Sequence, residues 1–222
     1  VVMSDDQTAD SMRFMSQTNQ QLGGEGATFT NSFASYPLCC PSRATFLTGR
    51  YPAAHQVHRN GNAYFPPHEK LVTKMFAEGG YDCGLVGKLH LSAAKRFEVR
   101  PDDGYRAFWW SHHPTPDAAR GHDYETWLRH EKKVDPAALY APVNYFCGPG
   151  VPADLHQTTW CSEMAIRFVT EQRDGPWLLS VNPFDPHAPF DAPPEYLARV
   201  RAAELPLPLF RESDLARQQA FA

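Results

Sequence analysis

The pattern of hydrophobic and polar positions predicts helices that alternate with strands along most of the chain. Hydrophobic residues at helical spacing, together with stop and start signals, predict helices at residues 10–22, 41–48, 68–78, 124–131 and 154–172, and a polar helix at 212–222. Alternating or continuous apolar runs predict strands at residues 1–3, 28–34, 81–91 and 176–182. Such alternation is typical of crossover units. The chain is therefore predicted to be α/β, with a mainly parallel central sheet flanked by helices on both faces.

Two regions stand apart from this alternation. Residues 97–150 are rich in Pro, Asp, His and aromatic residues, and we interpret them as an insertion that lines the mouth of a pocket. Within it, the aromatic and histidine-rich stretch 108–113 suits either a sugar ring or an aryl group. The opening strand at 1–3 is shorter than usual, and the last helix has little to pack against. We therefore expect the 222 residues to be part of a larger, truncated domain.

Composition narrows the possible partners. A chain of 222 residues with 42% hydrophobic content can form one globular domain or part of one. The net charge of −4, without a basic run, gives no support for nucleic-acid binding, and no apolar run is long enough for a membrane span. Five cysteines without a CxxC or Cys/His spacing argue against a disulfide framework or a zinc site. No signal peptide is visible, and both a cytoplasmic and an exported location are compatible with the sequence.

The most informative stretch is CCPSR at residues 39–43, which continues to Arg50. Pro41 suits the first turn of a helix and Gly49 suits the position just past its end, so a short helix at 41–48 is expected. The free N–H groups and partial positive charge at its N-terminus favour a thiolate, an alkoxide or a bound oxyanion beside Cys39. Arg43, one turn on, could reach back over the same helix end to pair with an oxyanion.

This stretch, CxPSR followed by TGR, resembles the signature of the sulfatase family within the alkaline phosphatase superfamily. The resemblance covers nearly the whole chain in four ordered landmarks, and it identifies residues 1–222 as the N-terminal part of a sulfatase catalytic domain. It implies that a maturation enzyme oxidises Cys39 to formylglycine (3-oxoalanine). Without the resemblance, Cys39 and Cys40 would be expected to be small buried residues, and Cys40 keeps that interpretation.

Asp5 and Asp6 follow the first strand directly, at the sheet edge where open α/β folds place ligands. Adjacent carboxylates are good oxygen ligands for a hard cation such as calcium. Their alternative role is to cap the helix that follows. By resemblance, Asp5 and Asp6 bind the active-site calcium together with residue 39.

The segment Gly87-Lys88-Leu89-His90 resembles the GKxH segment of the same family. Residues two apart on a strand face the same side, so Lys88 and His90 could converge while Leu89 packs on the other side. A lone lysine near a strand end is more often simply solvated. The resemblance implies that Lys88 binds the sulfate and that His90 contacts a hydroxyl of the formylglycine.

The fourth landmark is the stretch 182–190, which follows a predicted strand and contains His187 within the proline-rich loop at 184–194. Its PHxP pattern resembles a sulfatase loop whose histidine binds the sulfate and protonates the leaving oxygen. The alternative is a turn histidine held by the flanking prolines. His55 and His58 are either pocket residues or ordinary surface residues.

Taken together, the resemblance implies a sulfuric ester hydrolase that acts on a small-molecule or sugar sulfate ester through a formylglycine nucleophile and a bound calcium ion. Its catalytic group would comprise Cys39, Arg43, Lys88, His90 and His187. A phosphonate or phosphate monoester hydrolase of the same superfamily and a non-catalytic binding domain with the same fold are the alternatives. The chain lacks the DHG-type segment that supplies the remaining metal ligands and a further lysine in the family, so the 222 residues alone are expected to be incomplete as an enzyme.

Overall fold

A three-stranded parallel sheet forms the centre of the computed structural model, which describes residues 1–93, 97–114, 121–144, 146–207 and 209–220. The strands are β1 (Asp82–Gly87), β2 (Ala107–Trp110) and β3 (Trp177–Asn182), in the order β2-β1-β3. In the register, Gly84 of β1 lies opposite Ala107 of β2 and Leu179 of β3. The predicted α/β fold with a mainly parallel sheet is confirmed.

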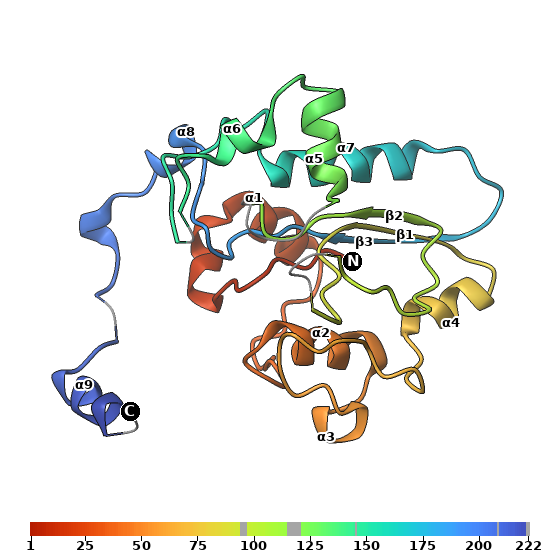
Figure 1. The fold of residues 1–222 in the computed structure, drawn as a ribbon, viewed down its shortest axis with the longest axis horizontal. Helices are drawn as coiled ribbons and strands as arrows, with labels where there is room; N and C mark the ends of the chain where they lie inside the picture. Colours follow the sequence, from red (N-terminus) through yellow and green to blue (C-terminus); the bar gives the residue numbers. More distant parts are fainter. Residues whose placement is uncertain (94–96, 115–120, 145, 208, 221–222) are drawn as a thin grey trace.

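Helices cover both faces of this sheet (Figure 1). Helices α5 (Asp123–His130) and α7 (Gln157–Thr170) pack on one face, and α4 (Val72–Glu78), with α2 (Cys39–Thr48) beyond it, lies on the other. Because neighbouring residues of a strand point to opposite faces, Leu85 joins the hydrophobic cluster beside α2 while Val86 joins the cluster beneath α7. The sheet is therefore buried on both sides, as expected for parallel strands.

The remaining helices are short. They are η1 (Ala9–Phe14), α1 (Ser16–Thr18), η2 (Asn19–Gly23), α3 (Pro52–His55), α6 (Pro136–Tyr140), α8 (Pro194–Leu197), η3 (Ala202–Glu204) and α9 (Glu212–Gln219). The polar helix α9, predicted at 212–222, buries none of its residues and lies apart from the sheet and its helices (Figure 1). Among the described residues, no helix is long and apolar enough to cross a bilayer.

The first residues of the chain add a short parallel pairing beside β3. Val181 N–H donates to the carbonyl of Val1, and Met3 N–H donates to the carbonyl of Val181, both at 2.9 Å. Val2 forms an isolated bridge rather than a full strand. This pairing still fixes the direction of the chain, so Asp5 and Asp6 follow at the carboxyl end of the sheet.

Near the start of the chain, the helix predicted at 10–22 is present but broken into short pieces, and the strand predicted at 28–34 is wrong. Residues 10–22 form three short helical turns of different kinds, η1, α1 and η2, and none of them buries a residue. Residues 28–34 form no strand, and Phe29 and Phe33 are 82% and 86% exposed. Both patterns require a neighbouring element to cover the apolar side chains, and no described part of the chain does so.

The sheet also differs from the prediction at its edges. Strand β1 was predicted to reach residue 91 but ends at Gly87, which has a φ of +103°. A Cβ at this position would lie 2.0 Å from the carbonyl oxygen of Asn182 in β3, so the close approach of the two strands requires glycine here. Helix α7 begins after His156, whose side chain accepts from Thr158 N–H, and not at the predicted cap Asp154.

The region 97–150 contributes to the main layers of the fold. It contains β2, which was not predicted, and α5, which was predicted at 124–131. Residues 115–120 and 145 lie outside the described residues, and the proposed lining of a pocket mouth by this region stays a prediction. Trp110, within the stretch suggested for ligand binding, is a core residue of β2 with 5% of its surface exposed.

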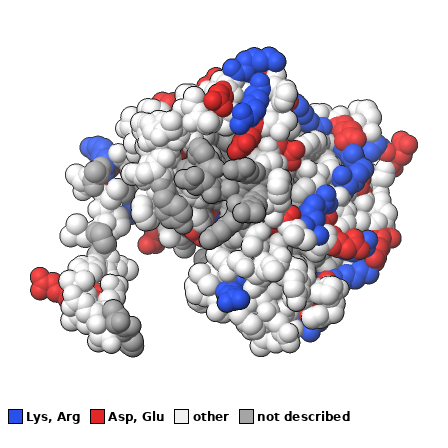
Figure 2. Space-filling model, in the orientation of Figure 1, with Lys and Arg blue, Asp and Glu red and all other residues white. Residues whose placement is uncertain are grey.

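Acidic and basic side chains are mixed over the same parts of the visible surface (Figure 2). Acidic and basic side chains also form ion pairs with each other, for example Asp82 with Arg106 and Arg173. The face shown in Figure 2 therefore carries no broad patch of a single charge.

Candidate active site

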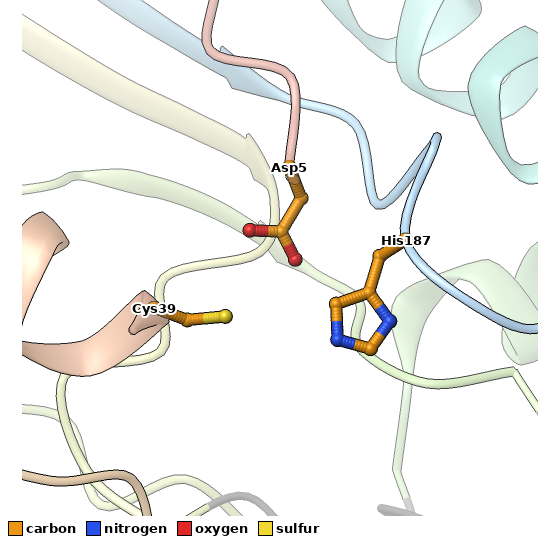
Figure 3. Close-up of side chains that lie close together, drawn as sticks. All are labelled: Asp5, Cys39 and His187. Atoms are coloured by element: carbon orange, nitrogen blue, oxygen red, sulfur yellow. The ribbon is translucent and has the colours of Figure 1, made fainter. Parts of the chain in front are cut away.

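The carboxyl edge of the sheet brings together three side chains from distant parts of the sequence. Asp5 follows the paired N-terminal segment, Cys39 is the first residue of α2, and His187 lies in the loop after β3. One ligand atom from each lies within 4.8 Å of the others. Figure 3 shows the thiol, the carboxylate and the imidazole arranged around one common space.

Asp5 is the electrostatic centre of this group. Its carboxylate is almost fully buried and accepts from Arg43 Nη2 at 3.1 Å, while its second oxygen pairs with the ammonium of Lys88. Burial opposes ionisation, but the two cations outweigh it and hold the pKa of Asp5 below its usual value. Asp5 is therefore ionised at neutral pH.

Lys88 and Arg43 are both turned inward. The Lys88 side chain is completely buried and also lies 4.9 Å from the centre of the Phe184 ring, so the interpretation as a solvated lysine is wrong. Arg43 Nη1 donates to the carbonyl of Lys88 at 2.7 Å. The predicted reach of Arg43 back over the end of α2 is thus replaced by a fixed position beside Asp5, which still places its positive charge in the same site.

Cys39 is half-buried at the start of α2, with Sγ donating to Asp6 Oδ1 at 3.8 Å. Burial raises the pKa of the thiol, and the carboxylates of Asp5 and Asp6 add to this effect, although Lys88 and Arg43 act in the opposite direction. Of the three species that the helix end could favour, the thiolate is therefore disfavoured for the unmodified residue, while the alkoxide and the bound oxyanion stay predictions. Cys39 is a protonated thiol at neutral pH.

His187 faces the same space and lies next to the carboxylate of Asp6. Its Nε2 lies 3.6 Å from Asp6 Oδ2, and Nδ1 lies 2.6 Å from the carbonyl oxygen of Ala188. A carbonyl can only accept, so Nδ1 carries the hydrogen and Nε2 is the nitrogen presented to the site. The backbone of the proline-rich loop thus holds His187, and the same contact aims it at Asp6.

His90 lies beside the centre but not on the strand that was predicted to carry it. Because β1 ends at Gly87, the argument that Lys88 and His90 share a strand face is wrong, although both side chains are buried. Burial, together with the charges of Lys88 and Arg43, lowers the pKa of His90 to about 3, so the ring is neutral. Its backbone has a φ of +55°.

Glu98 holds this turn, and no sequence pattern pointed to it. Its carboxylate accepts from His90 N–H at 2.8 Å, from Leu91 N–H at 2.5 Å and from the indole of Trp110 at 3.0 Å. A single glutamate in an irregular segment has no recognisable spacing to the residues that it binds. Only the folded chain reveals this contact.

Two further candidates have structural positions. Cys40 is fully buried in the core, as expected. His55 is also fully buried and bridges Thr45 Oγ1, at 3.0 Å, and Val57 N–H, at 3.1 Å. His55 therefore joins α2 to the segment after α3, whereas His58 is exposed.

A family model described as "Sulfatase" matches residues 1–212. The chain belongs to the sulfatase family. Among curated proteins, this sulfatase-family chain is 26% identical to an arylsulfatase of Clostridium perfringens over 85% of the chain and 41% of that protein. It is 30% identical to the iduronate 2-sulfatase of Mus musculus over 79% of the chain and 31% of that protein. The chain thus spans less than half the length of these relatives.

Solved structures show the same fold. A phosphonate monoester hydrolase from Silicibacter pomeroyi superposes with a TM-score of 0.70 at 17% identity, over 95% of this chain and 46% of that one. A protein solved in complex with its substrate D-glucosamine-2-N,6-O-disulfate superposes with a TM-score of 0.62 at 20% identity, over 94% of this chain and 38% of that one. The sulfatase-family chain therefore has the fold of part of these larger proteins.

Proposed function

We propose that the complete protein containing this chain hydrolyses sulfate monoesters at the site around Cys39. The observation that carries the proposal is the convergence of Cys39, Asp5 and His187 within 4.8 Å. Two buried cations, Lys88 and Arg43, adjoin the same space. A site that is positive on one side and offers a proton donor on the other suits the transfer of an anionic group.

The residues present fit part of a calcium site. Asp5 is ionised and faces Cys39, and the Asp6 carboxylate lies next to both Cys39 and His187. Oxygen ligands of this kind suit calcium, which takes six to eight of them, so other residues of the complete protein or water would supply the rest. Asp5 and Asp6 would hold the ion, with the oxygen of a modified residue 39 as a further ligand.

Formylglycine at position 39 would supply a hydrated aldehyde as the oxygen nucleophile, and calcium would bind and polarise that oxygen and the sulfate. The chain's own side chains supply the remaining chemistry. Lys88 and Arg43 balance the negative charge of the transferring group. His187 presents Nε2 to the site, and in its imidazolium form, with hydrogens on both ring nitrogens, it would donate the Nε2 hydrogen to the departing alcohol oxygen. His90 is neutral and could accept a proton from a hydroxyl at residue 39.

The substrate is proposed to be a small-molecule or sugar sulfate ester, and a formylglycine-generating enzyme is the proposed maturation partner. The family supports this substrate class, since relatives include an arylsulfatase and an iduronate 2-sulfatase. The 222 residues hold only part of the proposed metal site, so activity is expected of the complete protein and not of this chain alone.

The test compares Cys39→Ala with the matched control Cys147→Ala in the complete protein, co-expressed with a formylglycine-generating enzyme. Cys147 is an exposed free cysteine outside the site. We expect Cys39→Ala to abolish hydrolysis of 4-nitrophenyl sulfate with folding unchanged, and Cys147→Ala to leave the rate unaltered. Activity retained in Cys39→Ala would contradict the proposal.

The superposition on a phosphonate monoester hydrolase makes a second substrate class worth measuring. The same preparations are therefore assayed on 4-nitrophenyl phenylphosphonate. A higher kcat/KM for the phosphonate than for the sulfate would move the assignment to a phosphonate monoester hydrolase that uses the same centre. No turnover of either ester by a protein with modified Cys39 would favour a non-catalytic domain.

A further inference from the structure

A second cluster of ionisable groups lies behind the candidate active site. His156, at the start of α7, points toward the carboxylates of Asp185 and Asp191, and the three groups lie within 4.8 Å of one another. Only 8% of the His156 side chain is exposed. The cluster borders a cavity of about 380 Å³ that His187 also lines.

The hydrogen bonding of His156 decides what this cluster can hold. Nδ1 accepts from Thr158 N–H at 3.3 Å, and a backbone N–H can only donate, so Nδ1 carries no hydrogen. The hydrogen of the ring must then be on Nε2. This nitrogen lies 3.5 Å from Asp191 Oδ1 and 3.7 Å from Asp185 Oδ1. A metal on Nε2 would require the opposite tautomer and would leave two donors facing each other, so the geometry favours a proton over a metal.

This proton lies between the two ends of the loop that carries His187. Asp185 precedes His187 by two residues and Asp191 follows it by four. Asp185 is held a second time, because Thr158 Oγ1 donates to its other carboxylate oxygen. The N-terminal end of α7 therefore contacts the loop on both sides of His187, at Asp185 and at Asp191.

Asp185 also contacts Asp5 of the candidate active site. The backbone carbonyl of Asp185 accepts from Asp5 N–H at 3.2 Å. One carboxylate oxygen of Asp185 accepts from Thr158 and the other lies 3.7 Å from His156 Nε2, an electrostatic contact too long for a hydrogen bond. Together these contacts limit the freedom of Asp185 to move its own carbonyl. The position of Asp5 thus depends on the same contacts that fix the loop of His187.

We propose that Asp185 is a positioning residue, held by His156 and Thr158 at the start of α7, which sets the placement of His187 and Asp5. The proposal deepens the proposed function, on which its catalytic consequence rests. His156 holds the loop through its contacts with Asp185 and Asp191, and Thr158 donates to the second carboxylate oxygen of Asp185. None of these three residues contacts the reacting atoms.

The test uses Thr158→Val and His156→Asn in the complete protein, with Thr170→Val as the control. Valine keeps the shape of threonine without its hydroxyl, and asparagine retains a helix cap without reaching the loop. Thr170 lies in the last turn of the same helix, where its hydroxyl donates to the Ile166 carbonyl. The first readout is the ¹⁵N NMR spectrum of the histidine rings, with the His187 signals assigned through His187→Gln.

We expect the His187 nitrogens to report a single Nδ1–H tautomer in the parent protein and in Thr170→Val. In Thr158→Val and His156→Asn they should shift toward an average of the two tautomers. Unchanged His187 signals in both variants would overturn the proposal. An equimolar addition of zinc chloride that binds His156 Nε2, seen as a shift of its signals before those of His187, would also overturn it.

The second readout is turnover. Misplacement of a proton donor should lower kcat roughly tenfold to a hundredfold for an alkyl sulfate, with KM changed by less than about twofold. An aryl sulfate with a good leaving group should be affected less, because its oxygen needs less protonation. Equal losses for both esters would overturn the assignment to His187. If the NMR shift occurs in a protein without sulfatase turnover, the positioning role stands and the proposed function fails.

Discussion

Asp5 lies between two cations, Lys88 and Arg43, and all three side chains are almost fully buried. Charges removed from water are costly unless each has its partner, so this group is held together by mutual pairing. The same pairing keeps Asp5 ionised beside Cys39, where a bound cation and an anionic group would meet. The individual residues of the site therefore depend on one another for their charge states.

Replacing Lys88 with Met should test this dependence. The change leaves a buried carboxylate with one cation in place of two, and loss of a partner from a buried pair costs about 3–5 kcal/mol. The free energy of unfolding, measured by urea denaturation, should fall by this amount. Lys74→Met is the matched control, because Lys74 pairs with the exposed Asp102, and a surface pair contributes about 1 kcal/mol or less. Similar losses in the two variants would contradict the account.

At the scale of elements, the end of β1 shapes the site. The strand stops at Gly87, where the chain passes against Asn182 of β3 and turns Lys88 inward. The amide of Asn182 donates to the Lys88 carbonyl at 3.0 Å, which fastens the turn to β3. The position of the buried lysine is thus set by how closely the two strands approach.

We expect Gly87→Ala to destabilise the protein strongly, because the new Cβ would meet a backbone oxygen at 2.0 Å and the φ of +103° is strained for alanine. Gly80→Ala is the control, since Gly80 also has a positive φ, +87°, but has open space around it. The control should lose only about 1–2 kcal/mol. In thermal unfolding, the Tm of Gly87→Ala should lie well below the Tm of Gly80→Ala. The reverse order of the two Tm values would contradict the steric explanation.

Asp82, at the start of β1, predicts a pH effect. Hydrogen bonds from Arg106, together with the charges of Arg106 and Arg173, lower the pKa of Asp82 below its usual value. Because the pKa is lower in the folded state, Asp82 contributes stability above about pH 3.9, and this contribution is lost as the pH falls through the folded pKa. When urea unfolding is measured between pH 2 and 6, the free energy of unfolding should fall less toward low pH for Asp82→Asn than for the parent protein. An unchanged profile would contradict the assignment.

Local patterns predicted most of the elements whose partners lie within the described chain. Helix α2, with Gly49 as its left-handed cap, and strand β3 agree closely with expectation. The strand at 28–34 failed because alternation alone does not supply a neighbouring strand. Strand β2 was missed because four residues in a proline-rich region carry too little pattern. Among site residues, the motifs predicted Asp5, Cys39, Lys88 and His187 together, but not the pairing of Asp5 with Arg43, which depends on long-range packing.

At the scale of the whole molecule, we propose that one edge of the sheet forms part of an anion-transfer site. The chain spans 41% of the Clostridium perfringens arylsulfatase that it matches. Exposed apolar residues such as Phe29 and Phe33 lie in the segment that leads to Cys39. Asp5, Cys39 and His187 come from distant parts of the sequence, so long-range contacts assemble the part of the site that this chain holds.

Calcium should stabilise the complete protein if Asp5 and Asp6 are ligands. At a free concentration of about a hundred times the Kd, binding to the folded state alone adds about 2.7 kcal/mol. Thermal unfolding in calcium chloride against EDTA should show this increase, and Asp6→Asn should reduce it. Asp10→Asn, a nearby exposed carboxylate, is the control and should retain the effect. An equal response of all three proteins would argue against a metal at this position.

The most direct test of the account is peptide mass spectrometry across residues 39–43, on the complete protein co-expressed with a formylglycine-generating enzyme. The account predicts conversion of Cys39 from a thiol to an aldehyde, with Cys40 unmodified. A Cys39 that stays a thiol, while a control sulfatase is converted in the same cells, would contradict the proposed chemistry at this site.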